Sequence, residues 1–177
     1  MLKEKYKEIF PKLIEKFGYS PKIEKVVVNV GFGRLVSGKT SDEQRKIQDA
    51  ILNDLALITG QRLILTTAKK SISGFKIRKG QPIGAKVTLR GKRMNDFLER
   101  LINIALPRSR DFRGIDQSSI DKEGNLSIGI REHICFPEIS PEKVKNIFGF
   151  EITVVTTAKS RGEGLELLKL MGFPIKQ

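Results

Sequence analysis

Hydrophobic residues recur with a helical spacing in several stretches of the chain. Between residues 3 and 17 they share one helical face, and we expect a break or kink at Pro11, which has no backbone N–H to donate. A second helix is predicted after a capping box of Ser41 with Gln44, and Gly60 closes it. The apolar stripe of this helix is Ile47, Ile51, Leu55 and Ile58.

Further helices are predicted in the second half of the chain. One runs from Arg93 to about Ala105, and Pro107 stops it. A short helix begins at Ser140-Pro141, since proline is favoured at the first helical position. The last helix follows another capping box and ends at a glycine; these positions are Ser160, Glu163 and Gly172.

Five shorter stretches alternate between apolar and polar residues or are rich in Val and Ile. Period-two alternation predicts a sheet with one buried and one open face, which favours antiparallel strands. Because no linker or internal repeat separates the elements, we expect a single α+β domain over residues 1–177, with helices packed on one sheet face. The predicted strands are Ile23–Val30, Leu63–Thr67, Ala85–Arg90, Leu126–Ile130 and Glu151–Thr157.

The open face of this sheet carries side chains that can bind phosphate or ribose. An RNA-binding sheet of the RRM type stacks bases on aromatic residues, and this face has none. We therefore expect a folded, duplex-rich RNA recognised by shape and 2′-hydroxyl groups, with an ordinary solvated face as the alternative. The residues concerned are Asn29, Thr66, Lys86, Thr88, Arg90 and Arg131.

Charge is distributed unevenly. The stretch from Leu55 to Asn95 contains no Asp or Glu but ten Lys or Arg, among them Lys69 and Lys70. Its centre, Ser73–Gly84, holds three glycines and a proline, which predicts a long, flexible, exposed loop between two strands. A basic loop without compensating acids is typical of a surface that binds phosphates, and a partner would order it on binding.

The overall composition supports a globular, nucleic-acid-binding protein. The formal net charge is +13, with 39% hydrophobic and 30% charged residues. No apolar run approaches the roughly 18–20 residues that would cross a membrane, and the N-terminal residues alternate in charge. We expect a cytoplasmic protein with no membrane partner. The single cysteine, Cys135, excludes an internal disulfide and a multi-cysteine metal site.

One segment suggests a different function. Gly33–Thr40 matches the phosphate-loop pattern G-x-x-x-x-G-K-[ST] between a predicted strand and a predicted helix. Against nucleotide binding, no later strand ends in an Asp that would hold Mg²⁺, and Asp42 and Glu43 would repel phosphates. A capped helix after a glycine-rich loop explains the same residues, and nucleotide binding is kept as the alternative function.

No catalytic constellation is evident. His133 and Cys135 would share a strand face, but no third group orients them, so a packed thiol is favoured over a nucleophile. The sequence predicts no enzyme activity, no cofactor and no metal site.

Several long motifs identify a family. Leu55–Ser71, Ser73–Gly91 and Pro107–Gly114 resemble signatures of the bacterial form of the large-subunit ribosomal protein that is number five in the universal naming and binds 5S rRNA. Phe136–Glu138 and Val155–Ala158 continue the resemblance, which covers essentially the whole chain. Lys122-Glu123, Leu126 and His133 depart from the family pattern.

The resemblance implies a non-enzymatic role in the large ribosomal subunit. It implies that the open sheet face holds 5S rRNA, and that Asn29, Gln61 and Thr88 are contact residues. It further implies that the loop around residues 74–84 approaches the P-site tRNA. Other implied partners are 23S rRNA, other 5S-rRNA-binding ribosomal proteins, and a protein of the small-subunit head at an intersubunit bridge. The loop residues expected to contact tRNA are Phe75, Lys76, Arg78, Lys79 and Gln81.

Overall fold

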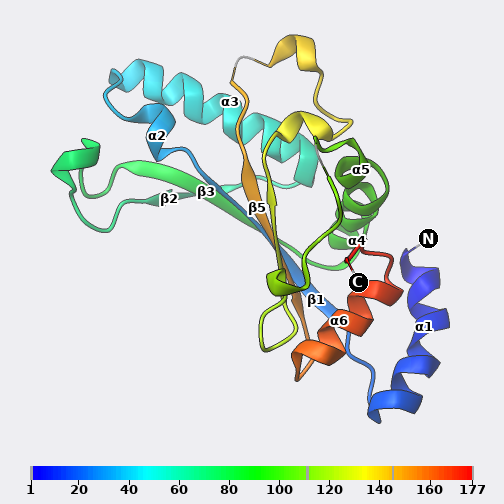
Figure 1. The fold of residues 1–177 in the computed structure, drawn as a ribbon. Helices are drawn as coiled ribbons and strands as arrows, with labels where there is room; N and C mark the ends of the chain where they lie inside the picture. Colours follow the sequence, from blue (N-terminus) through cyan, green and yellow to red (C-terminus); the bar gives the residue numbers. More distant parts are fainter. Residues whose placement is uncertain (1, 111, 145, 177) are drawn as a thin grey trace.

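A computed structural model describes residues 2–110, 112–144 and 146–176; Asp111, in the motif Pro107–Gly114, lies outside them. Helices and strands follow one another as in Figure 1. The helices are α1 (Leu2–Phe17), α2 (Gly33–Val36), α3 (Ser41–Thr59), α4 (Gly91–Arg100), α5 (Leu106–Arg108) and α6 (Arg161–Leu170). The strands are β1 (Ile23–Gly31), β2 (Ile64–Thr67), β3 (Pro82–Leu89), β4 (Leu126–Ile130) and β5 (Phe150–Thr156).

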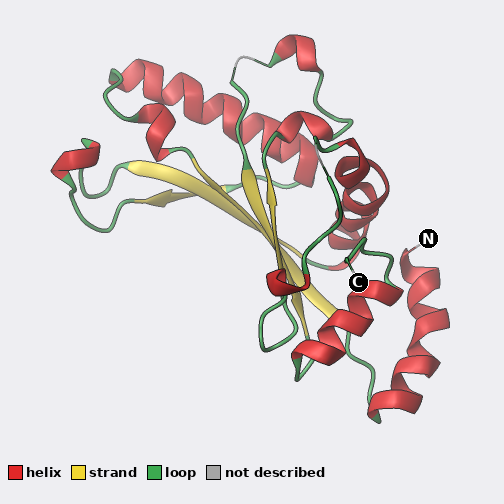
Figure 2. Ribbon diagram, in the orientation of Figure 1, coloured by secondary structure: helices red, strands yellow, loops and turns green. Residues whose placement is uncertain are grey.

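The strands form one antiparallel sheet in the order β2-β3-β1-β5-β4. The central strand β1 pairs with β3 on one side and β5 on the other. The sheet is strongly twisted, and its β2–β3 end projects away from the body of the molecule (Figure 2). All five predicted strands are present. Their starts and ends lie within one residue of the predicted positions, except that β3 begins three residues earlier. The predicted α+β class is confirmed.

One sheet face packs against the helices, as the alternation predicts. Val26, Val28 and Val30 of β1 are at most 1% exposed, and every second residue of β4 and β5 is buried in the same way. They join one hydrophobic cluster with α3, α4 and α6. Burying a side chain of this size stabilises the fold by about 1.5–3 kcal/mol. The residues that alternate with the buried ones are therefore held on the open face. The cluster includes Ile51, Leu55, Phe97, Leu98 and Leu167.

Two details of the first helices differ from expectation. Helix α1 passes through Pro11 without a break, and Ile9 and Leu13 are buried whereas Phe10 and Ile14 stay exposed. The capping box of α3 lies one residue earlier than predicted. The N-cap is Thr40, whose Oγ1 accepts the Glu43 N–H while the Glu43 carboxylate accepts the Thr40 N–H at 3.0 Å. Both pairs, 40/43 and 41/44, satisfy the sequence rule, so only the backbone geometry selects one.

The helix expected to stop at Pro107 continues to Arg108. Helix α4 passes into a π-helical stretch, η2 (Leu101–Ala105), and then into α5, which has proline in its first turn. Pro107 itself has no N–H to donate, and the Leu106 N–H before it still donates to the Leu101 carbonyl oxygen, so the helical path is kept. The short 3-10 turns are η1 (Ser73–Phe75), η3 (Gln117–Ser119), η4 (His133–Cys135) and η5 (Pro141–Lys143), the last at the predicted Ser140-Pro141 start.

Helix α6 begins after Ser160, whose hydroxyl oxygen accepts the Glu163 N–H. The predicted reciprocal half of the box is absent, because the Glu163 carboxylate instead accepts the Lys159 N–H at 2.8 Å and the Tyr19 hydroxyl. These hydrogen bonds hold the pKa of Glu163 below its ordinary value. Glu163 therefore ties the start of α6 to the segment after α1.

Candidate nucleic-acid interface

The open sheet face presents its polar side chains in rows that cross the strands. In one row Lys86 of β3 lies opposite Asn29 of β1, which lies opposite Glu151 of β5. In the next row Thr88 faces Val27, and the row continues through Thr153 and Ser127. The strand register therefore brings amide, hydroxyl and ammonium groups from four strands onto one surface. The residues of these rows are exposed or partly exposed.

Four of the predicted RNA-binding residues lie on this face: Asn29, Thr66, Lys86 and Thr88. Thr66 lies opposite Gly84, and an added Cβ on Gly84 would be 2.7 Å from both the Thr66 Oγ1 and the Val30 carbonyl oxygen. Only glycine fits there, because the Thr66 side chain and the β1 backbone fill the space that a Cβ would need. The five other predicted residues lie outside the strands: Gln61 between α3 and β2, Lys69 and Lys70 after β2, Arg90 after β3, and Arg131 after β4.

Two carboxylates modify the electrostatics expected for this surface. Glu151 is exposed on the open face beside Asn29, although no acid was expected there from the sequence. Arg90 pairs with Glu24, with 2.9 Å between Nη1 and Oε1, and this hydrogen bond holds the pKa of Glu24 below its ordinary value. Such an exposed pair is weak because water and salt screen it, so a phosphate can displace Glu24 from Arg90.

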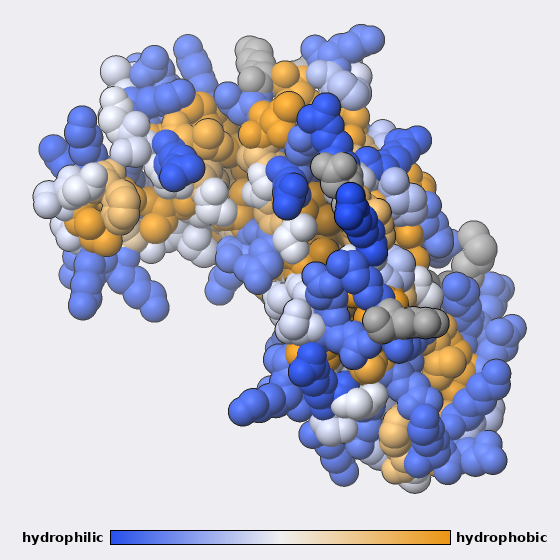
Figure 3. Space-filling view, in the orientation of Figure 1, coloured by the Kyte–Doolittle hydropathy of each residue, from blue (hydrophilic) through white to orange (hydrophobic). Residues whose placement is uncertain are grey.

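The basic loop after β2 contains a turn and a bridge that the sequence did not predict. Its backbone closes through η1 and an antiparallel bridge between Ile72 and Ile77, and Lys76 adopts a left-handed conformation. The Ser37 hydroxyl donates to the Phe75 carbonyl oxygen at 2.7 Å, so α2 supports the loop. Phe75 in this loop is 65% exposed. Some apolar side chains are also visible at the projecting end of the molecule (Figure 3).

The phosphate-loop pattern has a structural role. Its first half, Gly33–Val36, is helix α2, and its last residue, Thr40, caps α3. A phosphate loop instead wraps successive backbone N–H groups around a triphosphate, and a helical turn cannot do so. Hydrogen bonds from Thr40 hold the pKa of Glu43 below its ordinary value, which keeps a carboxylate at the helix start. The geometry supports the capped-helix interpretation.

His133 and Cys135 are both buried, as a packed thiol requires. Burial raises the pKa of Cys135 to about 11, so the reactive thiolate does not form at neutral pH. His133 stacks on Phe148, accepts the Phe148 N–H on Nδ1, and places Nε2 3.4 Å from an Asp54 carboxylate oxygen. Burial lowers the pKa of His133 although Asp54 opposes the shift; a neutral imidazole fits its complete enclosure and its role as an acceptor.

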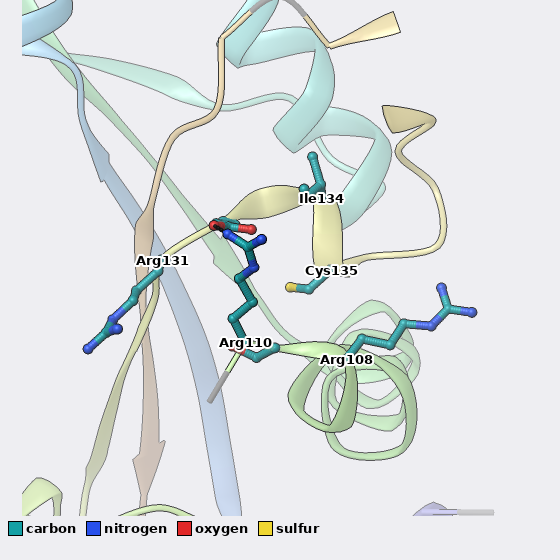
Figure 4. A pocket seen from close by; sticks show the side chains of 7 residues that line it. Arg108, Arg110, Arg131, Ile134 and Cys135 are labelled. Carbon is teal, nitrogen blue, oxygen red and sulfur yellow. Dashed lines mark ion pairs between the residues drawn. The ribbon is translucent and has the colours of Figure 1, made fainter. Parts of the chain in front are cut away.

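A second basic surface surrounds the motif Pro107–Gly114. Arg108, Arg110 and Arg131 line a pocket of about 580 Å³ whose floor includes Cys135 (Figure 4). Arg110 lies 3.7 Å from Glu132, whereas Arg108 and Arg131 point away in different directions. Of the three arginines, only Arg131 was predicted to lie on a surface for RNA. Within the described residues, no group of His, Cys, Asp or Glu could hold a metal ion and no helix is long and apolar enough to cross a membrane.

Comparison with known proteins decides the family. Residues 19–78 match the family described as ribosomal protein L5, and residues 82–175 match the family that describes the C-terminus of the same ribosomal protein. The chain is 55% identical to the large ribosomal subunit protein uL5 of Halothermothrix orenii, over 100% of this chain and 99% of that protein. It is 51% identical to the uL5 of Syntrophomonas wolfei, over 96% and 95%. The chain belongs to the ribosomal L5 family.

Membership in the L5 family makes the chain a structural, non-enzymatic constituent of the large ribosomal subunit, where it lies with rRNA and other ribosomal proteins. The two matched segments are not separate in space. The first contributes β1 and β2, the second contributes β3, β4 and β5, and β1 lies between β3 and β5. The sheet is thus complete only when both segments are present.

Proposed function

We propose that the open sheet face binds 5S rRNA and attaches it to the large subunit. The observation that carries the proposal is the pair of adjoining rows in which Asn29 and Thr88, both neutral, lie beside Lys86. Neutral amides and hydroxyls add little to general attraction, but they can hydrogen-bond ribose 2′-hydroxyls in the wide minor groove of an RNA duplex. Strands about 4.8 Å apart give the face a width of about 19 Å between its outer strands.

Charge supports the same role. The net charge of +13 supplies attraction to any polyphosphate. Selectivity then depends on the uncharged groups of the face. Gln61, Lys69, Lys70 and Arg90 lie near its edges and complete the proposed contact set.

We propose further that the loop after β2 contacts the tRNA in the P site. Lys76, Arg78 and Lys79 are cations without an ion-pair partner in the described part of the chain, and they follow the exposed Phe75 within four residues in the sequence. An exposed aromatic ring among cations can stack on a base or ribose while the cations bind the backbone. Because Gln81 is hydrogen-bonded to this loop and to α3, we assign it a role in holding the loop shape.

The remaining partners follow from the place of the family in the ribosome. We propose that the protein works on the cytoplasmic ribosome as one domain, contacts 23S rRNA and other 5S-rRNA-binding proteins, and meets a protein of the small-subunit head. Arg108 and Arg131 point in different directions, so each is available for a separate phosphate contact (Figure 4).

A competition gel shift tests the main proposal. The full-length protein is titrated with 5S rRNA, tRNA and an unrelated RNA duplex between about 50 and 200 mM salt, the range over which non-specific affinity falls steeply. All three should bind at low salt, because counterion release favours any polyphosphate. The preference for 5S rRNA should grow as salt rises, since hydrogen bonds from neutral side chains release no counterions. Equal affinities at every salt concentration would leave only non-specific attraction.

A further inference from the structure

A pocket of about 600 Å³ lies between the start of α3 and the basic loop after β2. Its lining combines Lys39, from the end of the phosphate-loop pattern, with three loop cations, Lys76, Arg78 and Lys79. No acidic residue contributes to the lining. Four cations from two segments, 37 to 40 positions apart in the sequence, therefore face one cavity. The neutral lining residues are Gly38, Thr40, Ser41, Gln44 and Gln81.

Hydrogen bonds fix the two walls of this pocket relative to each other. The Gln44 amide donates to the Lys39 carbonyl oxygen at 2.8 Å, and its own oxygen accepts the Gln81 amide at 3.2 Å. The Gln81 side-chain oxygen in turn accepts the Arg78 N–H at 3.1 Å. Two neutral amides thus join the backbone of Lys39 to that of the loop, and the cations are held near one another by groups that do not neutralise them.

The pKa of Glu43 lies below its ordinary value chiefly because Thr40 donates hydrogen bonds to its carboxylate, and the charge of Lys39 adds to the shift. The Glu43 carboxylate turns back onto the Thr40 N–H and hydroxyl, at 3.0 and 2.9 Å. Over residues 2–110, 112–144 and 146–176, none of the four cations forms an ion pair with a carboxylate. Like charges gathered in a concave surface create a positive potential, and an anion that enters relieves it.

We propose that this pocket binds a phosphodiester group of an RNA strand, and that Lys39 is a further RNA-binding residue outside the loop. The inference rests on the proposed contact between the loop and tRNA, and it adds the wall formed by α3. A free nucleoside triphosphate fits less well. The helical residues Gly33–Val36 cannot wrap a triphosphate, and no carboxylate lining the pocket is available to hold Mg²⁺. A single phosphodiester needs only the cations.

Lysine footprinting on ribosomes tests the inference directly. Ribosomes carrying the full-length protein, with and without tRNA in the P site, are treated with an amine-acylating reagent, and modification is measured by mass spectrometry. tRNA should protect Lys39 together with Lys76 and Lys79. Lys46 is the matched control, because it is exposed on α3, the helix that follows Lys39, but does not line this pocket. Its reactivity should not change.

The outcomes separate this inference from the proposal on which it rests. Protected loop lysines with an unchanged Lys39 would overturn the inference and leave the contact between loop and tRNA intact. Unchanged reactivity of all three lysines would overturn both. Protection of Lys39 in the free protein by micromolar Mg²⁺-ATP would make the pocket a nucleotide site and also overturn the inference.

The salt dependence of tRNA binding gives a second measurement. One phosphate contact contributes a slope of roughly 0.7–0.9 in log affinity against log salt, which is about five-fold or more per ten-fold change in salt. Ribosomes with Lys39→Ala should therefore bind P-site tRNA about five-fold more weakly than wild type at about 0.1 M salt and about equally near 1 M. Lys46→Ala should match wild type throughout. Equal slopes for Lys39→Ala and wild type would contradict the assignment.

Discussion

Glu151→Gln should tighten binding of 5S rRNA. Glu151 lies opposite Asn29 on the open face, one strand away from Asn29 and two strands away from Lys86. If RNA phosphates approach Lys86, the carboxylate repels them from about 10 Å, because neighbouring strands lie about 4.8 Å apart. Gln has nearly the same shape as Glu and removes only the charge. A gain in affinity is a strong test, since a misfolded variant cannot produce it.

The size of the gain follows from Coulomb's law. Two unit charges about 10 Å apart interact with about 0.4 kcal/mol in bulk water and about 1.7 kcal/mol at an effective dielectric constant of about 20. The affinity for 5S rRNA should therefore rise about 2- to 20-fold at low salt. The gain should shrink above about 0.1 M salt, where the Debye length falls below the separation. Filter binding with labelled 5S rRNA at about 30, 100 and 300 mM salt measures both effects.

Glu15→Gln provides the control for the change in net charge. Glu15 is exposed on α1, which packs against α4 and α6 on the helical side of the molecule. A general gain in attraction would appear equally in both variants. The reasoning is refuted if Glu151→Gln binds like wild type or no better than Glu15→Gln, because RNA would then not approach the row of Lys86 and Asn29.

Three further changes have defined outcomes. Burial lowers the pKa of His133, the one histidine. The unfolded chain thus binds more protons than the folded chain below about pH 6.5, and the free energy of unfolding should fall as the pH is lowered from there. In urea titrations of His133→Gln, the free energy of unfolding should no longer fall over this pH range. If it still falls, the buried His133 is not the cause of the decline. Gly164→Ala would place Cβ 2.4 Å from the Gly124 Cα, so the urea midpoint should drop by the equivalent of about 1–3 kcal/mol; an unchanged midpoint would refute that close approach. Calorimetry should detect no saturable binding of millimolar Mg²⁺-ATP; micromolar binding that disappears in Lys39→Ala would establish the nucleotide alternative.

The sheet and its faces were predictable because they depend on local alternation. Each of Asn29, Lys86 and Thr88 has buried neighbours on both sides in the sequence, and a period of two then fixes its face. The pairing of Asn29 with Glu151 was not predictable, since it depends on the register of strands that are far apart in the sequence. One residue of slip would have moved Glu151 to the other face.

The structure of the loop after β2 was not predictable from the residues of the loop itself. Glycines and charges between Ser73 and Gly84 predicted flexibility, yet the ordering contacts come from outside the loop, through Ser37 and Gln44. Neither residue carries a local signal that it will meet the loop. The pocket containing Lys39 was missed for the same reason. Conversely, Gly33–Thr40 matches the sequence pattern of a phosphate loop without having its structure. The helical conformation of Gly33–Val36 favours the capped-helix interpretation over nucleotide binding.

The most direct test of the central claim measures 5S rRNA binding by the Asn29→Ala, Thr88→Ala double variant. Both side chains are exposed on the open face, so the circular dichroism spectrum and the urea midpoint should match wild type. Removing each specific hydrogen bond to the RNA should cost about 1–3 kcal/mol, and binding to an unrelated duplex should stay unchanged because no cation is removed. Asn53→Ala, at an exposed position of α3, serves as the control. We predict at least about a five-fold weaker affinity for 5S rRNA in the double variant alone; wild-type affinity in that variant would contradict the assignment of the sheet face to 5S rRNA.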